Sequence, residues 1–127
     1  MRPRVVIVDD SPQVAATYEI GLAAAGYDAI AVTRAVDAIA EIENGASALI
    51  TDLDMPRMDG FELISKLRAI PAHVNLPIVV VSGSTEPGAE SRARAAGANA
   101  YFTKPCSPAL LRQELDRFFL ERPKVES

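Results

Sequence analysis

Three short runs of this sequence consist of residues suited to a buried strand: 5–8 (Val-Val-Ile-Val), 48–51 (Ala-Leu-Ile-Thr) and 78–81 (Ile-Val-Val-Val). A strand with one face in water alternates apolar and polar side chains, whereas a strand covered on both faces is apolar along its length. Strands of this second kind occur almost only in parallel sheets that carry helices on both sides. The runs therefore predict an α/β fold with a central parallel sheet.

Segments with the spacing of amphipathic helices separate these runs. The expected helices cover residues 12–25, 34–43, 61–70, 87–96 and 108–120. Two further strands are expected over 27–32 and 98–103, and a loop over 71–77. For the second helix, Thr33 is the expected cap, and Val36, Ile39 and Ile42 form the expected buried face.

The fourth predicted helix has a weak apolar face. It offers only Ala89, Ala93 and Ala96 on its inner side, so it would bury less apolar area than the other helices. We therefore expect it to be the most mobile helix of the domain.

Five strands that alternate with five helices predict a doubly wound parallel sheet. Parallel crossovers are right-handed, and the helices must cover both faces of the sheet. We expect the strand order 2-1-3-4-5, in which the winding reverses between the first and third strands.

Composition excludes several classes of protein. The 127 residues suffice for one domain with its own core, and a net charge of −4 gives no basic footprint for direct nucleic-acid binding. Apolar segments are too short for a signal peptide or a membrane span, so we expect a cytoplasmic protein without membrane contact. The single cysteine, Cys106, agrees with a reducing compartment, and we expect it to be a small buried filler rather than a redox sensor.

Polar side chains follow four of the five predicted strands. Asp9 and Asp10 follow the first strand, Asp52 the third, Ser82 ends the fourth, and Lys104 follows the fifth. In the expected order these residues share the carboxyl edge of the sheet, where α/β proteins place their ligands. Three like charges repel one another unless a cation or protons intervene, and oxygen ligands suit Mg²⁺. We therefore expect a magnesium site at this edge.

This set of residues suits phosphoryl transfer, which needs a nucleophile, a metal, a fixed positive charge and a hydrogen-bond donor. Asp52 is the expected nucleophile, because carboxylates form acyl phosphates. Asp9 and Asp10 would hold Mg²⁺ directly or through water. Lys104 would neutralise a phosphate oxygen, and Ser82 would donate through its hydroxyl.

At these residues the sequence resembles the receiver domains of bacterial two-component response regulators, which include the chemotaxis receivers. The resemblance covers almost the whole chain and implies a flavodoxin-like receiver fold over residues 1–121, with 122–127 as a polar tail or the start of a linker. The residues that carry it are Asp9-Asp10, Asp52, Met55-Pro56, Met58-Asp59-Gly60, Ser82-Gly83, Gly97-Ala98, Tyr101 and Lys104-Pro105.

The resemblance implies that Asp52 accepts a phosphoryl group from a histidine kinase or a phosphotransfer protein. Mg²⁺, with Mn²⁺ as a substitute, would be held by Asp10, Asp52 and the backbone carbonyl of Asp54, with Asp9 in the outer shell or sharing the ion. The chain would catalyse only its own phosphorylation and dephosphorylation, and would not be an enzyme in the usual sense.

The resemblance also implies a switch. Ser82 would move to the new phosphate, Tyr101 would turn inward, and Lys104 would stay on the phosphoryl group; the bond between Lys104 and Pro105 is expected to be cis. The surface of the fourth helix, fifth strand and fifth helix would then change its affinity for a downstream protein, a fused output domain or a second copy of the chain.

Three positions depart from the usual pattern of the family, one of them Cys106, which replaces the apolar, often aromatic residue usual after Lys-Pro. Asp54 adds a carboxylate two residues after the acceptor, where it would influence dephosphorylation by either repelling or coordinating an approaching water. Ser84, two residues after the switch hydroxyl, is short and would leave the site open to water.

Other functions use similar residues. An aspartyl-phosphate hydrolase would carry a general acid two residues after its nucleophile, and Asp54 meets that spacing. A binding module of the same fold would have lost phosphorylation, but the acceptor, metal and lysine positions are all present. A flavodoxin-like electron carrier needs a hydroxyl-rich phosphate loop, for which Asp9-Asp10 has the wrong charge.

Overall fold

The computed structural model describes residues 2–120 and contains one five-stranded parallel sheet in the order β2-β1-β3-β4-β5. The predicted strand order is therefore confirmed. The strands are β1 (Arg4–Val8), β2 (Asp28–Val32), β3 (Ala48–Thr51), β4 (Ile78–Ser82) and β5 (Ala100–Thr103). The helices are α1 (Pro12–Ala24), α2 (Ala35–Glu43), α3 (Gly60–Arg68), α4 (Ala89–Ala96) and α5 (Pro108–Phe119), with a short 3₁₀ helix, η1 (Pro71–His73).

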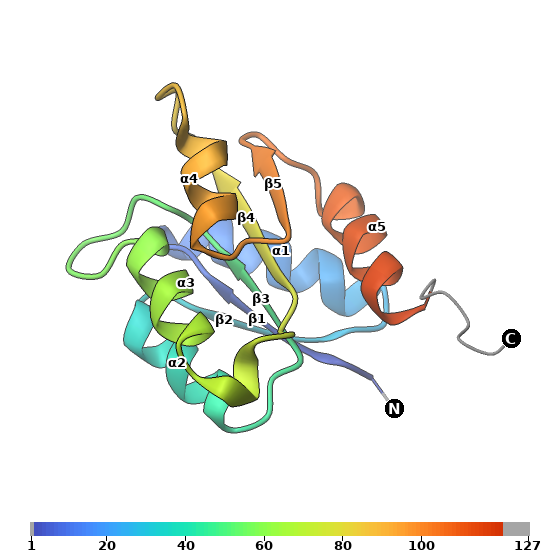
Figure 1. Ribbon diagram of the computed structural model, residues 1–127. Coiled ribbons are helices and arrows are strands. Elements are labelled where there is room, and N and C mark those ends of the chain that lie inside the picture. The colour runs from blue at the N-terminus through green and yellow to red at the C-terminus, as the bar shows by residue number, and fades with distance from the viewer. Residues whose placement is uncertain (1, 121–127) are drawn as a thin grey trace, which may run out of the picture.

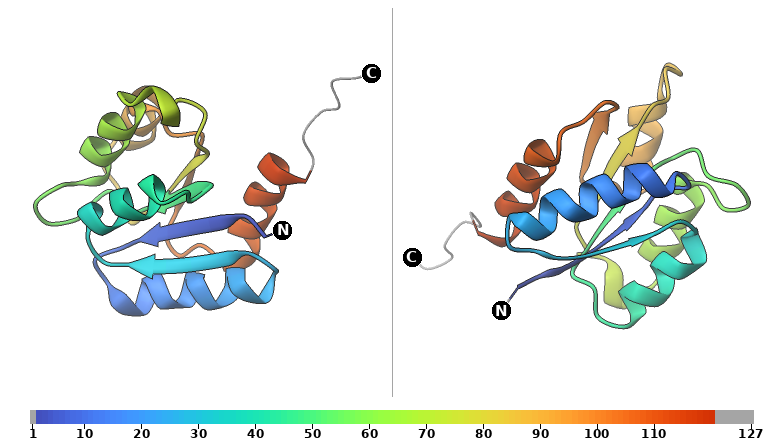
Figure 2. Two further views of the ribbon diagram at one scale, coloured as in Figure 1. Left: turned by 90° about the horizontal axis from the view of Figure 1, so that it is seen from below. Right: turned by 180° about the vertical axis from the view of Figure 1, so that it is seen from behind.

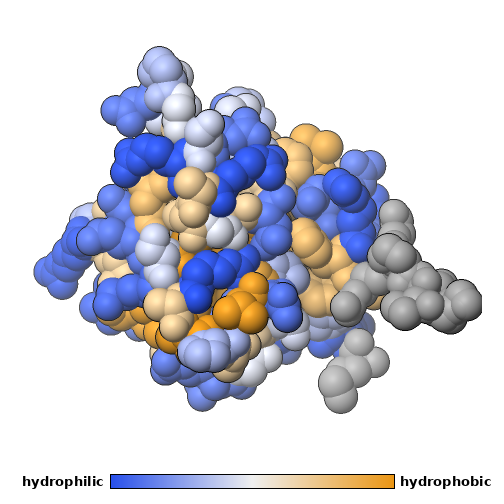
Figure 3. Space-filling model, viewed as in Figure 1, coloured by the Kyte–Doolittle hydropathy of each residue, from blue (hydrophilic) through white to orange (hydrophobic). Residues whose placement is uncertain are grey.

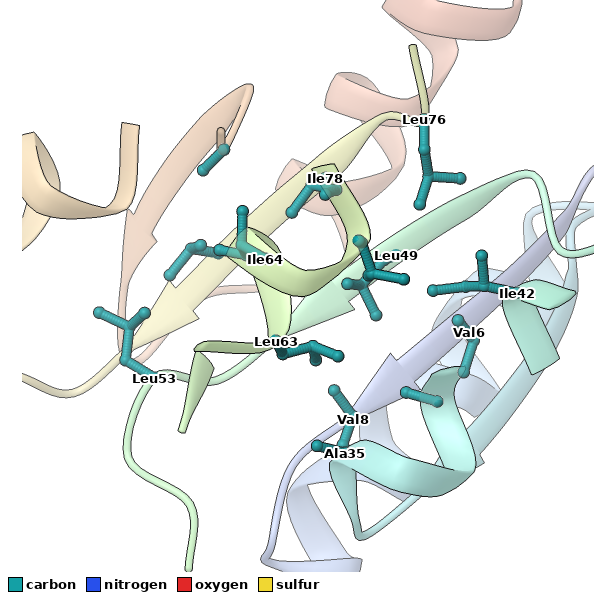
Figure 4. Packing of buried hydrophobic residues seen from close by; sticks show 14 of the residues in the cluster. Val6, Val8, Ala35, Ile42, Leu49, Leu53, Leu63, Ile64, Leu76 and Ile78 are labelled. Carbon is teal, nitrogen blue, oxygen red and sulfur yellow. The ribbon is translucent and has the colours of Figure 1, made fainter. Parts of the chain in front are cut away.

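The helices form two layers around the sheet: α1 and α5 cover one face, and α2, α3 and α4 cover the other (Figures 1 and 2). Successive residues of the central strands point to opposite layers, so Val5 and Ile7 pack with α1 and α5, while Val6 and Val8 pack with α2 and α3. Figure 4 shows the core on the second side, where Leu49 and Leu63 lie between sheet and helices. This double burial explains why the central strands are apolar along their whole length.

Two helices start at the predicted residue: α1 at Pro12 and α5 at Pro108. Ser11 and Ser107 each accept a hydrogen bond from a backbone N–H of the first turn, and Pro follows each of them. Asp59 forms a capping box with Glu62 at the start of α3. These caps satisfy backbone donors that would otherwise have no partner.

The start of α2 differs from the prediction. Its cap is Arg34 and not Thr33, and the cap side chain makes no hydrogen bond to the first turn. Val36 is 53% exposed, whereas Ala35 and Ala38 are buried together with Ile42. The prediction was wrong for Val36, because small alanine side chains give little signal in an apolar pattern, whereas Ile42 is buried and Ile39 packs against the core as predicted.

Other boundaries differ by a few residues from the prediction. The expected loop after α3 contains η1, because Pro71 can start a turn of 3₁₀ helix. Helix α4 begins at Ala89 and not at residue 87, after Gly88 in the left-handed conformation, and β5 begins at Ala100. The tail expected over residues 122–127 lies outside the described residues. Among residues 2–120, the structure has no helix that is long and apolar enough to cross a membrane.

Two residues of α2 test this packing. Ile42→Ala is expected to lower the free energy of unfolding by about 2–5 kcal/mol, because the Ile42 side chain is buried in the core. Val36→Ala, the matched control on the same helix, is expected to change it by less than about 0.5 kcal/mol. Urea unfolding followed by circular dichroism measures both. Similar losses for the two variants would contradict the observed orientation of α2.

Candidate functional site

Two adjacent strands bring three carboxylates together. The register pairs Val8 of β1 with Thr51 of β3, so the residues that follow these strands emerge side by side at the carboxyl edge of the sheet. Asp9 and Asp52 are buried there, Asp10 is exposed, and one carboxylate oxygen of each lies within 4.8 Å of the other two. The structure thus unites the acidic residues that the sequence placed at two strand ends.

Lys104 reaches this cluster from the segment after β5. Its Nζ lies 2.8 Å from Oδ2 of Asp9 and 3.3 Å from Oδ2 of Asp52. The backbone N–H of Lys104 donates to the carbonyl of Ser82 at 2.9 Å, and the peptide bond to Pro105 is cis, the form that the resemblance implies. The lysine therefore links the segment after β5 to the ends of β1 and β3.

The Asp52 carboxylate is held by its own backbone as well as by the lysine. The Leu53 N–H donates to Oδ1 of Asp52 at 2.8 Å, and the buried Thr51 hydroxyl donates to the Asp52 carbonyl at 2.7 Å. The Gly60 N–H donates to the Leu53 carbonyl at 2.9 Å, and a side chain at Gly60 would overlap the Asp52 carbonyl. The start of α3 thus fixes the peptide that orients the Asp52 carboxylate.

Sequence reasoning did not find these supporting contacts. In the sequence, Gly60 is notable only as part of the motif Met58-Asp59-Gly60, and Thr51 only as part of an apolar run. Their contacts depend on how closely α3 approaches β3, which no local pattern reveals.

Burial and charge alter the protonation of the site. Burial raises the pKa of Asp52 above the usual carboxyl value, and the neighbouring Asp9 adds to the effect, whereas Lys104 opposes it. Burial would lower the pKa of Lys104, but its hydrogen bond to Asp9 and the charges of Asp52 and Asp9 outweigh burial and raise it. The lysine therefore remains a cation, and Asp52 is a carboxylate of raised basicity.

The remaining predicted residues surround this cluster. Ser82 is fully buried, and its hydroxyl accepts a hydrogen bond from the Ser84 N–H at 3.0 Å. Tyr101 is half-buried and packs against the core on the side of α2, α3 and α4. Asp54 is exposed, and Ser84 is half-buried. Ser82, Ser84 and Asp54 lie at or after the carboxyl end of a strand, whereas Tyr101 lies within β5.

Cys106 is buried, as predicted, beside Pro105 and the α1 residues Val14 and Tyr18. Burial raises the pKa of its thiol, which favours the thiol over the reactive thiolate. The predicted burial of this side chain is confirmed.

The donor set fits a hard divalent cation. Three carboxylates and one ammonium group leave a local excess of negative charge, and the exposed Asp10 gives solvent access to the cluster. Carboxylate oxygens are the ligands that Mg²⁺ prefers.

Comparisons with known proteins agree with this geometry. Residues 5–116 match the family model described as the response regulator receiver domain. The chain is 30% identical over 116 residues to the chemotaxis protein CheY1 of Helicobacter pylori, a match that covers 89% of this chain and 94% of CheY1. It is 35% identical over 118 residues to the gliding motility regulatory protein of Myxococcus xanthus, covering 91% of this chain but 15% of that protein.

A solved structure of the same fold is also similar. The chemotaxis response regulator CheY4 of Vibrio cholerae has a TM-score of 0.84 and 28% identity to this chain, covering 92% of this chain and 98% of CheY4. Receiver domains are signalling domains of two-component systems rather than classical enzymes. Because the family model spans nearly all of the sheet and its helices, this chain belongs to the response regulator receiver domain family.

Proposed function

We propose that this chain accepts a phosphoryl group from a histidine kinase or a phosphotransfer protein on Asp52 and uses it to switch an output surface. The observation that carries the proposal is the Asp52 carboxylate itself, which lies at a strand end between Lys104 and two further carboxylates. A buried carboxylate of raised basicity beside a fixed cation is suited to attack a phosphorus atom.

In the proposed transfer, an oxygen of Asp52 forms a bond to phosphorus while the phosphorus–nitrogen bond of the donor phosphohistidine breaks. Lys104 stabilises the negative charge on the phosphoryl oxygens, and the Ser82 hydroxyl donates to another of them after it turns from Ser84. The Leu53 N–H keeps Oδ1 of Asp52 in place throughout. Hydrolysis of the acyl phosphate returns the carboxylate.

Receiver domains bind Mg²⁺ at an acidic pocket of this kind. In this chain Asp10, Asp52 and the backbone carbonyl of Asp54 would hold it, with Asp9 in the outer shell or sharing the ion, and Mn²⁺ could replace it. The bound ion would supply positive charge that offsets the repulsion between the carboxylates and the phosphoryl group. Asp54 and Ser84 would modulate the lifetime of the phosphoryl group from the open side of the site.

The proposed output is a change in the surface of α4, β5 and α5 as Ser82 and Tyr101 move. The partner would be a downstream protein, a fused output domain or a second copy. Some relatives continue beyond the receiver: the transcriptional regulatory protein KdpE of Mycobacterium tuberculosis matches this chain over 57% of its length. We assign residues 1–121 to the receiver domain, 122–127 to a tail or linker, and the cytoplasm as its location.

Phosphorylation is tested by intact mass after incubation with acetyl phosphate and Mg²⁺. One phosphoryl adduct that requires Mg²⁺ and is removed by hydroxylamine is expected on the parent chain. Asp52→Asn should abolish the adduct, whereas Asp54→Asn, which removes an exposed carboxylate two residues away, should retain it.

Two results would contradict the proposal. Steady consumption of acetyl phosphate without an adduct would favour an aspartyl-phosphate hydrolase that uses Asp54 as its acid. Neither adduct nor consumption would indicate a binding module that has kept only the fold.

The metal site is tested by thermal unfolding, which does not depend on phosphorylation. At about ten times its dissociation constant, Mg²⁺ is expected to add about 1.4 kcal/mol to the free energy of unfolding of the parent chain. Asp10→Asn should remove most of this gain. Lys66→Gln, a change on the exposed side of α3, should keep it. If Mg²⁺ stabilised Asp10→Asn and Lys66→Gln equally, the ion would bind at a site that does not include Asp10.

The raised pKa of Asp52 predicts a pH dependence in the absence of metal. At pH values between 3.8, the ordinary pKa of an aspartate, and the raised pKa of Asp52, the folded chain binds more protons at this residue than the unfolded chain does. The contribution of Asp52 to the free energy of unfolding therefore falls as the pH rises through this range. The Asp52→Asn variant should therefore gain stability relative to the parent through that window and keep the gain at neutral pH. A midpoint of thermal unfolding that is lower in the variant at neutral pH would contradict this sign.

A further inference from the structure

Helix α4 is attached firmly at its carboxyl end. The Arg68 guanidinium at the end of α3 donates to the Gly97 carbonyl from Nε at 3.0 Å and from Nη2 at 2.7 Å. It also donates to the Asn99 side-chain oxygen at 2.9 Å and to the His73 carbonyl at 2.7 Å. These bonds connect Gly97 and Asn99, which lie between α4 and β5, to α3 and η1.

The same cluster reaches the sheet. Oδ1 of Asn99 accepts a second hydrogen bond, at 2.8 Å, from the N–H of Ile78, the first residue of β4. Gly97 has a φ of 128°, and a side chain there would overlap the Arg68 side chain. The carboxyl end of α4 is therefore fixed to both strands that flank it.

The amino end of α4 is held more weakly. Gly88 precedes the helix in the left-handed conformation, and no side chain caps the first turn. Only Ala89 and Ala93 of the helix are buried, and the surface over α4 in Figure 3 is largely hydrophilic. Arg92 adds an exposed contact, with its guanidinium carbon 3.9 Å from the centre of the Phe61 ring. Moving this end would expose little apolar surface.

A chain of hydrogen bonds joins this loose end to the phosphorylation site. The Ser82 hydroxyl accepts from the Ser84 N–H at 3.0 Å, and the Ser84 hydroxyl accepts from the Glu86 N–H at 3.2 Å. The Glu86 carbonyl then accepts from the N–H of Ala89, the first residue of α4, at 3.2 Å. Each of these hydrogen bonds joins residues two or three positions apart in the sequence. The segment between Ser82 and α4 is therefore held by successive hydrogen bonds, which we call the relay.

We propose that Ser84 is a positioning residue that transmits movement of Ser82 to the amino end of α4, while Arg68 holds the carboxyl end as a pivot. The proposal rests on the proposed function, because Ser82 moves only when Asp52 carries a phosphoryl group. When the Ser82 hydroxyl turns to a phosphoryl oxygen it leaves the Ser84 N–H, and this release lets Ser84 move. The Ser84 hydroxyl, still bonded to the Glu86 N–H, carries the displacement to Glu86 and the first turn of α4. Because coupling is reciprocal, a partner that binds the displaced α4 stabilises the phosphoryl-bound arrangement of Ser82.

The ground-state part of the proposal is tested by amide exchange measured residue by residue by NMR, without any ligand. Ser84→Ala should speed exchange of the Glu86 and Ala89 amides by about two- to ten-fold, the factor that corresponds to one hydrogen bond, and should leave residues 95–98 unchanged. Ser84→Thr keeps the hydroxyl and should restore the parent rates. Thr85→Ala, a change at the exposed neighbour, is the matched control and should have no effect on those amides. Arg68→Gln should speed exchange at Gly97 and Ala98 instead.

The transmission is tested by repeating the measurement with beryllium fluoride and Mg²⁺, which together stand in for a bound phosphoryl group. In the parent chain, changes at residues 84–91 should exceed those at 94–99 by several-fold. Ser84→Ala should keep the change at Leu53, next to the acceptor, but lose at least half of the change at residues 86–91, and Ser84→Thr should restore it. In Arg68→Gln the change should spread to residues 94–99.

Different results would overturn different claims. Equal changes at both ends of α4 in the parent chain would overturn the pivot, and equal losses in Ser84→Ala and Thr85→Ala would overturn the role of Ser84. A response at Leu53 that leaves residues 84–91 unaffected would overturn the transmission alone. No response at Leu53 in the parent chain would overturn the proposed function and the transmission with it.

Discussion

The structure of the site depends on the two ion pairs that Lys104 makes with Asp9 and Asp52. Each carboxylate is almost completely buried, and two such charges side by side are costly unless a cation lies between them. The lysine comes from the far side of β4, so its contacts draw the segment after β5 across the sheet edge towards β1 and β3. One side chain thereby offsets the charge of the Asp52 carboxylate and fixes the relative positions of three loops.

The sequence predicts the sheet and the site for the same physical reason. Apolar runs mark strands buried on both faces, and parallel strands place the residues after their carboxyl ends at one edge, so Asp9, Asp10 and Asp52 had to meet once the order 2-1-3-4-5 held. On α2, Val36 was wrongly placed on the buried face, because the alanines that complete that face are nearly neutral in an apolar pattern. The contacts of Arg68 join segments that are distant in the sequence, and no local pattern carries that information.

The three helices on one face of the sheet, α2, α3 and α4, are held in place by different kinds of contact. The core around β1, β3, α2 and α3 uses large aliphatic side chains, whereas α4 contributes alanines to it and is held mainly by polar contacts. Hydrogen bonds can be exchanged for others of similar energy, while buried leucine side chains cannot leave the core at small cost. A helix held in this way can have two arrangements of similar free energy, which a switch requires.

The hydrogen bond from the Gly60 N–H to the Leu53 carbonyl closes the segment between β3 and α3 into a loop with both ends anchored. Pro56 and Arg57, in the outer part of this loop, are exposed. A small label attached at either position would replace no buried contact, so it would report on this loop while the hydrogen bond that holds the Leu53 peptide stays in place.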